Sequence, residues 1–416
     1  MNLRDFRRAG HAPTLLAAFL YFDMSFMVWL LPGALANSIS SEFGLTDFQK
    51  GLMVAVPLLG GAVLRLVLGL LADRIGARRA GLLGMAITSV PLTLGWLWAD
   101  SFSAMILVGL LLGAAGASFA AALPLASRWY PPQYQGLAMG IAGAGNSGTA
   151  LATFFGPRIA AAWGWHAVFG LALIPLLLVM GFFWLVARDA PNQPAPRPLS
   201  AYADVLRIGD AWWFCLLYAI TFGGFVGLAS FLNVFFVSQY DVSKVDAGSF
   251  ATLCVIAGSA LRPFGGHLAD RFGGVSVLSG LYLAAGAALL GLATSPPSLF
   301  VGTALLFATM AALGMGNGAV FQLVPLRFPR EIGVVTGLVG AAGGFGGFLL
   351  PTALGSLKQL TGGFGPGFVA FGLLGGLGGA VALSFASRGW RDMLLETGDR
   401  IEPDAPAVRP EVQGVA

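Results

Sequence analysis

Three charged residues stand alone inside long apolar stretches of the sequence. Arg65 and Arg262 each lie eight residues before an aspartate in a similar loop, and Asp23 lies within the run YFDMSF. A guanidinium group keeps its proton and offers paired N–H donors to carboxylates and oxyanions. A buried carboxylate either pairs with a cation or binds a proton. These residue types indicate anion binding, with Asp23 as a candidate proton-binding group.

A glycine-rich stretch at 143–148, GAGNSG, matches the G-x-G-x-x-G spacing of dinucleotide-binding loops. That fingerprint requires a preceding strand, a following helix and an acidic residue about 20 residues later. The stretch instead lies in an uncharged run, and the next acid is Asp189. The sequence therefore predicts a glycine-lined helix that carries one amide, Asn146, and no nucleotide site.

The composition places these residues in a membrane. Of 416 residues, 57% are hydrophobic and 10% are charged, and the mean hydropathy is +0.80. Apolar runs of roughly 20 residues, which can cross about 30 Å of hydrocarbon as a helix, recur along the chain. We expect an all-α membrane protein with twelve transmembrane helices near 14–37, 48–72, 79–98, 101–127, 134–160, 165–187, 211–238, 246–269, 275–294, 298–322, 333–357 and 364–387.

The basic residues predict the orientation. Lys and Arg gather in alternate loops, beginning with the segment before the first helix, and such residues accumulate in cytoplasmic loops. The opposite loops and helix ends hold Lys50, Arg158, Lys244 and Lys358. We therefore expect a multi-pass protein of the cell (inner) membrane with both termini cytoplasmic. The net charge of +4 belongs to this orientation signal and does not indicate a nucleic-acid partner.

Catalytic and metal-binding clusters are not visible in the sequence. The three histidines are scattered near helix ends, and Cys215 and Cys254 lie in apolar runs where they serve as small packing residues. We expect no enzyme activity, no metal site, no cofactor and no obligate protein partner.

The sequence repeats itself after its midpoint. RLVLGLLADRIGARR, from Arg65, and RPFGGHLADRFGG, from Arg262, match at a constant offset of 197 residues, which indicates two pseudo-symmetric six-helix halves. This is the architecture of transporters that bind their substrate between the halves. We expect the loop residues to hold the halves together without touching substrate; they are Gly69, Asp73, Arg74, Gly76 and Arg78 in the first copy, and Gly266, Asp270 and Arg271 in the second.

The halves define the expected domain boundaries. Residues 1–187 form the N-terminal half and 211–387 the C-terminal half, joined by a proline-rich cytoplasmic linker at 188–210. The polar segment 388–416 is expected to be a disordered cytoplasmic tail.

Both arginines are expected near the middle of the membrane. Eight residues at about 1.5 Å each place Arg65 and Arg262 about 12 Å from the helix end, where a guanidinium costs several kcal/mol without a partner. A small planar anion between them would be such a partner; alternatively, each arginine binds helix carbonyls. Asn146 could donate to the same anion or hold helices together. The glycines that could leave room for it, or pack helices tightly, are Gly143, Gly145, Gly344 and Gly346.

Asp23 is expected at a depth similar to that of Arg65. It lies about nine residues into the first helix, so it either takes up a proton during transport or has no transport role, as a fixed salt bridge or a cavity-facing carboxylate. Both interpretations remain open from the sequence.

The loop GLLADRIGARR resembles the signature between the second and third helices of the major facilitator superfamily. Within it, FDMSFMVW, ASRWYPPQYQGLAMGIAGAGNSG and GMGNGAVFQLVPLRFPREIGVVTGLVGAAGGFGGFLLP resemble the nitrate/nitrite porters over nearly the whole chain. The resemblance implies that Tyr218, Phe222 and Phe119 line the anion site, whereas unmatched aromatic residues would be packing residues. One departure is Gly347, which occupies the position that pairs with Asn146 in the repeat.

The resemblance and the charges together predict a nitrate importer. With Arg65 and Arg262 alone the empty site carries +2, and nitrate lowers it to +1, so only the loaded carrier would turn over. With ionised Asp23 the empty site carries +1, and nitrate plus a proton restores +1, which favours proton symport. A nitrate/nitrite antiporter is the alternative, and a non-transporting membrane sensor is a further one. Nitrate, possibly replaced by nitrite, protons and the lipid bilayer are the expected partners.

Overall fold

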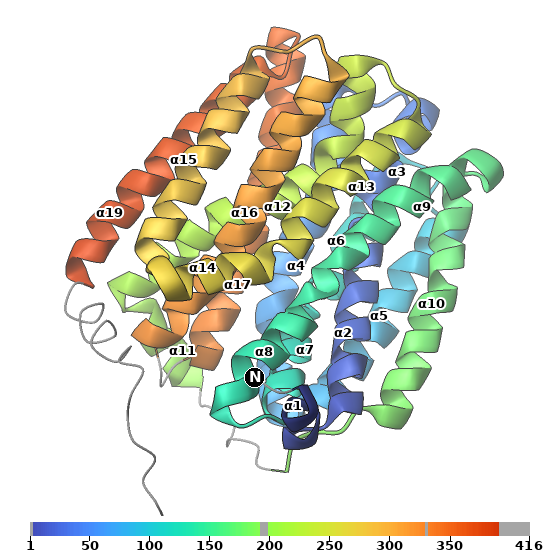
Figure 1. The fold of residues 1–416 in the computed structure, drawn as a ribbon. Helices are drawn as coiled ribbons and strands as arrows, with labels where there is room; N and C mark the ends of the chain where they lie inside the picture. Colours follow the sequence, from blue (N-terminus) through green and yellow to red (C-terminus); the bar gives the residue numbers. More distant parts are fainter. Residues whose placement is uncertain (1–2, 192–198, 329–331, 391–416) are drawn as a thin grey trace, which may run out of the picture.

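The computed structural model describes residues 3–191, 199–328 and 332–390, and every regular element in these ranges is a helix. Eleven of the helices in these ranges are long and apolar enough to cross a membrane. They stand side by side in two bundles, with α5 and α10 at one edge and α15 and α19 at the other (Figure 1). The predicted all-α membrane fold is confirmed.

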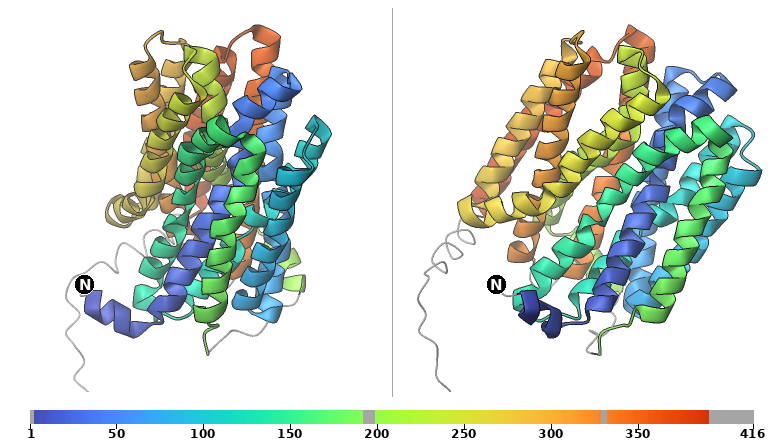
Figure 2. Two further views of the ribbon diagram at one scale, coloured as in Figure 1. Left: turned by 90° about the vertical axis from the view of Figure 1, so that its right-hand side faces the viewer. Right: turned by 45° about the vertical axis from the view of Figure 1, so that its right-hand side comes forward.

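The N-terminal half contains ten helices and one short 3-10 turn. They are α1 (Leu3–Ala9), α2 (Ala12–Trp29), α3 (Leu31–Phe43), α4 (Asp47–Ile75), α5 (Ala77–Leu97), α6 (Phe102–Gly116), α7 (Phe119–Ser127), α8 (Pro132–Gly143), η1 (Ala144–Ser147), α9 (Gly148–Trp163) and α10 (Trp165–Val186). The N-terminus, α1 and the end of α10 lie on one face of the bundle, which we call the terminus face; the opposite face is the far face (Figure 2).

The C-terminal half repeats this arrangement. Its elements are α11 (Leu199–Leu206), α12 (Gly209–Tyr240), α13 (Lys244–Ala260), α14 (Arg262–Phe272), α15 (Gly274–Ala293), α16 (Leu299–Arg327), α17 (Ile332–Thr361), α18 (Gly365–Phe371), the π-helical segment η2 (Gly372–Gly378) and α19 (Gly379–Gly389). Helix α11 lies inside the predicted linker 188–210, whose residues 192–198 are outside the described ranges. Most of the predicted tail, 391–416, is also outside them.

The predicted helix at 134–160 is broken, and it is the one of the twelve expected segments that is not among the eleven candidate spans found in the described residues. Its chain runs as α8, η1 and α9, with the 3-10 turn at AGNS. Glycine and asparagine have low helix propensity, and 3-10 turns inside longer helices are typical of functional hinges or strained sequence. The three pieces together still make up the twelfth crossing segment.

The two copies of the repeated loop end their helices in the same way. Gly76 separates α4 from α5 with φ +91°, and Gly273 separates α14 from α15 with φ +86°. Positive φ is accessible to glycine at little cost, which accounts for glycine at both positions. The copies differ near their arginines: α4 is continuous through Arg65, whereas α13 ends at Ala260 and α14 begins at Arg262, followed by Pro263.

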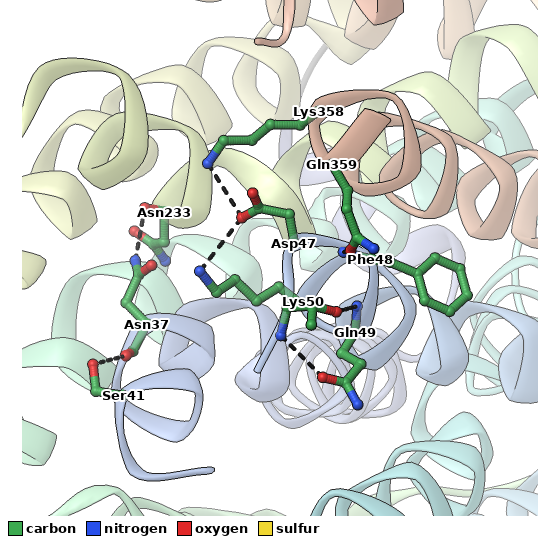
Figure 3. Close-up of polar contacts among 10 residues, drawn as sticks. Asn37, Ser41, Asp47, Phe48, Gln49, Lys50, Asn233, Lys358 and Gln359 are labelled. Carbon is green, nitrogen blue, oxygen red and sulfur yellow. Dashed lines mark hydrogen bonds and ion pairs between the residues drawn. The ribbon is translucent and has the colours of Figure 1, made fainter. Parts of the chain in front are cut away.

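On the far face, Asp47 joins the two halves (Figure 3). Asp47 Oδ1 accepts from Lys358 Nζ of α17 at 3.2 Å and from Lys50 Nζ of its own helix at 3.4 Å. The next backbone N–H, that of Phe48, donates to Gln359 Oε1 at 3.0 Å. A side chain from α17 therefore satisfies one of the free N–H groups in the first turn of α4.

Other polar contacts extend this seam along the far face. Lys244 Nζ donates to Ser41 Oγ at 3.0 Å, and Arg158 Nη2 donates to Ser249 Oγ at 2.8 Å, each pair crossing between the halves. The four basic residues that the sequence assigned to this side all lie in or beside the seam: Lys50, Arg158, Lys244 and Lys358.

Two glycines on the terminus side of helices α8 and α17 have open space beside them. A Cβ atom added at Gly140 of α8 or at Gly337 of α17 would meet nothing within 4 Å. In contrast, a Cβ at Gly51, near the far face, would lie 2.4 Å from the Pro351 carbonyl oxygen of the other half. The halves are therefore in close contact at Gly51, whereas the positions beside Gly140 and Gly337 are open.

Candidate anion-binding site

Arg65 lies at the middle of α4 and connects the two halves. Its side chain is buried, with 1% of the residue exposed. One terminal nitrogen, Nη1, donates to the Gly340 carbonyl of α17, and the other, Nη2, donates to the Gly116 carbonyl at 2.8 Å. Gly116 is the last residue of α6, where helix carbonyls have no partner within their own helix. The break between α6 and α7 thus supplies an acceptor for a buried guanidinium.

The charge of Arg65 is not neutralised by an acid. In the part of the chain that the structure describes, none of the ion pairs includes Arg65 or Arg262. The two carbonyl contacts agree with the alternative that Arg65 binds helix carbonyls, but carbonyl dipoles compensate the charge of the guanidinium only partially. The Arg65 Nε–H is buried and has no hydrogen-bond partner among these residues. The group retains both its charge and an unused donor.

Aromatic rings surround the Arg65 guanidinium. Its central carbon lies 5.2 Å from the centre of the Phe119 ring and 5.3 Å from that of Phe222. The Tyr218 and Phe222 rings are stacked, with centroids 5.1 Å apart and an angle of 4° between their planes. Because ring faces are electronegative and exclude water, they stabilise a desolvated cation. The three aromatic residues named from sequence are therefore brought together with Arg65.

Arg262 approaches the site from the other half and is less buried. Its guanidinium carbon is 4.0 Å from the position a Cβ would take at Gly143 of α8, and its Nη1 is buried without a partner in the described ranges. It lies close enough to Arg65 and to Tyr218 to interact with both electrostatically. Each arginine thus reaches a glycine-rich helix of the opposite half: Arg262 lies beside Gly143 of α8, and Arg65 contacts Gly340 of α17.

The predicted glycines have different neighbours. Gly143 faces Arg262, but a Cβ at Gly145 would lie 2.8 Å from the backbone nitrogen of Asp23. Gly344 packs on Ala62, and Gly346 packs on the carbonyl of Ala219. These three are sites of close helix packing, the second of the two interpretations given above.

Two other glycines of α17 lie beside the site. A Cβ at Gly340 would be 3.0 Å from Cδ of Arg65, and a Cβ at Gly343 would be 2.7 Å from the Tyr218 ring. The absence of side chains at these positions therefore leaves space for the arginine and the stacked rings.

Asn146 lies in the 3-10 turn and is fully buried. Neither its amide nitrogen nor its amide oxygen has a partner among the described residues. An unpaired buried amide is costly, so Asn146 is available to a partner other than the described residues.

Asp23 is held at the same turn. Ser147 Oγ donates to Asp23 Oδ1 at 2.7 Å, and the backbone N–H of Gly148 also donates to the carboxylate. Gly148 is the first residue of α9, so Asp23 lies at the positive end of that helix. In the described ranges no basic residue forms an ion pair with Asp23, which argues against the fixed salt bridge.

The loop residues lie away from the arginine site. Asp73 Oδ1 accepts from Arg128 Nη2 at 3.0 Å, which joins the end of α4 to the end of α7 within one half. The Arg78 backbone N–H donates to Asp189 Oδ1 at 3.0 Å, also within that half. Most of the remaining loop positions are less enclosed: Gly69 and Gly266 have no neighbour closer than 3.6 Å to an added Cβ, and Arg74, Asp270 and Arg271 are exposed. Gly76 is buried at the corner described above.

Buried hydrogen-bond donors without a partner converge on this region. Among the described residues they include Arg65 Nε, Arg262 Nη1 and the Asn146 amide nitrogen. Two cations, unpaired donors and apolar rings gather here, and this combination suits a small anion, because the charge and oxygen atoms of an anion would pair with the groups that have no partner among the described residues. The Major Facilitator Superfamily model matches residues 17–351 of this sequence. The chain belongs to the Major Facilitator Superfamily.

Curated members of this superfamily resemble the chain over most of its length. The Probable nitrate/nitrite transporter NarK2 of Mycobacterium tuberculosis (strain ATCC 25618 / H37Rv) is 36% identical over 364 residues, covering 83% of this chain and 89% of that protein. The Nitrite extrusion protein of Bacillus subtilis (strain 168) is 34% identical, with coverage of 83% and 87%. The Probable nitrate/nitrite antiporter NarK1 of Thermus thermophilus is 33% identical, with coverage of 82% and 84%. Membership of the nitrate/nitrite porter family, predicted from sequence, is confirmed.

A solved structure shows the same superfamily fold. The bacterial homologue of the human lysosomal transporter Spinster, in an inward-facing and unoccupied conformation, aligns with a TM-score of 0.62 and 20% identity. The alignment covers 95% of this chain and 99% of that chain. At this level of identity the likeness supports the fold alone.

Sequence reasoning missed three rings that complete the aromatic surroundings. Phe22 lies 5.8 Å and Phe321 also 5.8 Å from Phe119, centroid to centroid, and Phe26 lies 6.3 Å from Phe222. Phe22 and Phe26 flank Asp23 one helical turn apart, and that spacing beside a buried acid was the available signal.

Proposed function

We propose that the protein is a secondary transporter that imports nitrate across the cell (inner) membrane. The observation that supports this best is the fully buried Arg65, which has no acidic partner in the described ranges, faces two aromatic rings and lies near Arg262 of the other half. The planar guanidinium matches flat oxyanions through paired N–H donors. The relatives' names, which specify nitrate and nitrite, support this substrate class.

The site between the halves suits alternating access. Because Arg65 donates to Gly116 of one half and to Gly340 of the other, any rotation of the halves must change its hydrogen bonds. An anion bound between the two arginines would replace carbonyl acceptors and reduce the mutual repulsion of the cations. With the far face closed by the seam, the described conformation corresponds to one open toward the terminus face, which we assign to the cytoplasm.

Proton symport is the mode that we propose. Asp23 can take up a proton without breaking an ion pair, and its partner Ser147 is adjacent to Asn146 in the turn. Protonation of Asp23 would change its hydrogen bond with Ser147, and this bond holds the 3-10 turn that carries Asn146. The charge count agrees, because ionised Asp23 gives the empty site and the site with nitrate plus a proton the same net charge of +1. A cotransported proton also offsets about 2.3 kcal/mol per 100 mV that opposes anion entry.

Nitrate/nitrite exchange is the second candidate mode. One relative is named an antiporter and another a nitrite extrusion protein. In this mode Asp23 would serve as a cap for α9, a role that its contact with the Gly148 N–H allows.

Nitrate binding by charge-retaining variants tests the site. Arg65→Lys and Arg262→Lys keep the positive charge but lose the planar pair of donors, so each should weaken nitrate binding by about tenfold or more. Isothermal calorimetry on the purified protein measures this change. Arg158→Lys, which affects only the far-face seam, should bind as the wild type does. Unchanged affinity in both site variants would remove the arginines from the proposed site.

A further inference from the structure

A hollow of about 620 Å³ on the terminus face carries an excess of positive charge. Residues of the α4–α5 corner and of the end of α10 line it, and its charged members are Arg74, Arg78, Arg79, Arg188 and Asp189. Four arginines and one aspartate leave a formal excess of three positive charges. The hollow is separate from the arginine site, since Arg74 lies at the end of α4, about two and a half turns beyond Arg65.

Two of these residues form a fixed base for the hollow. The Arg78 backbone N–H donates to Asp189 Oδ1 at 3.0 Å, and Arg78 Nη2 donates to the Trp184 carbonyl at 2.7 Å. Asp189 also fills the space beside Gly76, because a Cβ there would lie 2.6 Å from Oδ2. The aspartate is therefore engaged by the corner, while the side chains of Arg74, Arg79 and Arg188 are exposed around it.

The hollow opens beside the lipid-facing surface. Helices α5 and α10 pack together, for instance where Phe183 contacts Gly81. Their outer faces expose apolar side chains up to the edge of the hollow, where Leu185 is 70% exposed and Trp184 is 60% exposed. Basic residues next to such a face lie at the depth of lipid headgroups, where tryptophan is also enriched.

The cluster is specific to the first half. At the offset of 197 residues, Arg74 corresponds to Arg271, but Arg78 corresponds to Val275 and Arg79 to Ser276. Arg78 and Arg79 therefore belong to the first copy of the loop motif alone, and only Arg74 has an arginine counterpart in the second copy.

We propose that this hollow binds the phosphodiester headgroup of an anionic glycerophospholipid, whose acyl chains lie along α5 and α10. Arginine forks match phosphate oxygens in a bidentate manner, and basic pockets between membrane helices on the cytoplasmic side bind anionic headgroups. The adjoining apolar face favours a lipid over free phosphate, because a lipid also has acyl chains that contact this face and inorganic phosphate has none.

Lipid binding is tested on the purified full-length protein in neutral detergent. Native mass spectrometry counts bound phosphatidylglycerol, phosphatidylcholine and inorganic phosphate. The wild type should prefer phosphatidylglycerol to phosphatidylcholine by about tenfold or more. In the double variant Arg79→Gln, Arg188→Gln its affinity should fall roughly 25-fold, since each surface arginine contributes about fivefold. In the single variant Arg79→Gln, the affinity for phosphatidylglycerol should fall about fivefold.

Matched variants distinguish a built site from general charge attraction. Arg271→Gln, Arg388→Gln removes two exposed arginines elsewhere and should keep the lipid preference. Nitrate binding should be unchanged in both double variants, so the test does not depend on the proposed transport function. Equal binding of the two lipids by the wild type, equal losses in the two double variants, or displacement of phosphatidylglycerol by equimolar inorganic phosphate would each overturn the proposal.

Discussion

At the scale of single residues, Arg65 is a buried cation without an acidic partner in the described ranges, as our proposed anion site requires. Its two terminal nitrogens donate to carbonyls from different halves, and two rings cover it at 5.2 and 5.3 Å. The carbonyls fix the position of the guanidinium, while Nε remains unpaired among the described residues. In the proposed site, positioning by the backbone and incomplete charge compensation would together hold the guanidinium near the anion before it binds.

Gly340 should be required for this positioning. In Gly340→Ala, the new Cβ would lie 3.0 Å from Arg65 Cδ and 3.2 Å from Nη1, so the arginine must move. We expect nitrate affinity to fall by about tenfold, as for the loss of one charge-assisted hydrogen bond. Calorimetry should show no change for Gly337→Ala in the same helix, where a Cβ meets nothing within 4 Å. Equal effects of the two substitutions would contradict this role.

The sequence identifies isolated charges more readily than their surroundings. Arg65, Arg262 and Asp23 are found because charge inside an apolar run is rare. Phe321 and Phe26 are not, because the chain has 32 phenylalanines and packing alone explains most of them. The sequence also does not show which glycines of a helix face the site, because that depends on how the helix is rotated about its own axis.

At the scale of helices, the broken segment α8–η1–α9 connects Asp23 to the anion site. Its 3-10 turn carries Asn146 and Ser147, and Asp23 binds the turn at 2.7 Å. The break was not predicted, because GAGNSG lies in an uninterrupted apolar run that has the length of a normal membrane helix. Directly after the turn, α2 approaches so closely at Gly148 that no side chain fits there, and the sequence alone does not show this contact.

The seam on the far face should control which side of the protein is open. Lys358→Met removes the contact from α17 to Asp47, and we expect it to shift the ratio of far-face-open to far-face-closed molecules by about two- to fivefold. Distances between spin labels at the exposed positions Trp163 and Leu360 measure this ratio. Lys50→Met removes a lysine from the same carboxylate within one half and should leave the ratio unchanged. The same shift in both variants would mean that charge, and not the link between halves, is responsible.

Asp73 should affect transport and not binding. It joins the end of α4 to the end of α7 through Arg128, far from Arg65, so Asp73→Asn should slow nitrate uptake while equilibrium affinity stays within about threefold. Uptake into proteoliposomes and calorimetry on the same preparation give the two quantities. Loss of nitrate binding in a folded Asp73→Asn protein would refute this assignment.

At the scale of the whole molecule, the repeated halves place one arginine on each side of a shared site. The twelve segments and the repeat were predictable, because membrane thickness fixes helix length and a constant offset reveals internal symmetry. The symmetry is incomplete in ways that the offset cannot show: α4 runs through Arg65, whereas a new helix begins at Arg262. Which face is closed also depends on contacts between residues far apart in sequence, such as Asp47 and Lys358.

The whole account joins anion binding at two arginines to proton binding at Asp23, and nitrate uptake into proteoliposomes tests that connection most directly. Wild-type protein should accumulate nitrate when the outside is made acidic, without nitrite inside. Asp23→Asn fixes the empty site at +2 and the loaded site at +1, so net uptake should collapse while nitrate/nitrate counterflow survives. Wild-type uptake that ignores the pH gradient and requires internal nitrite would contradict proton symport and establish exchange.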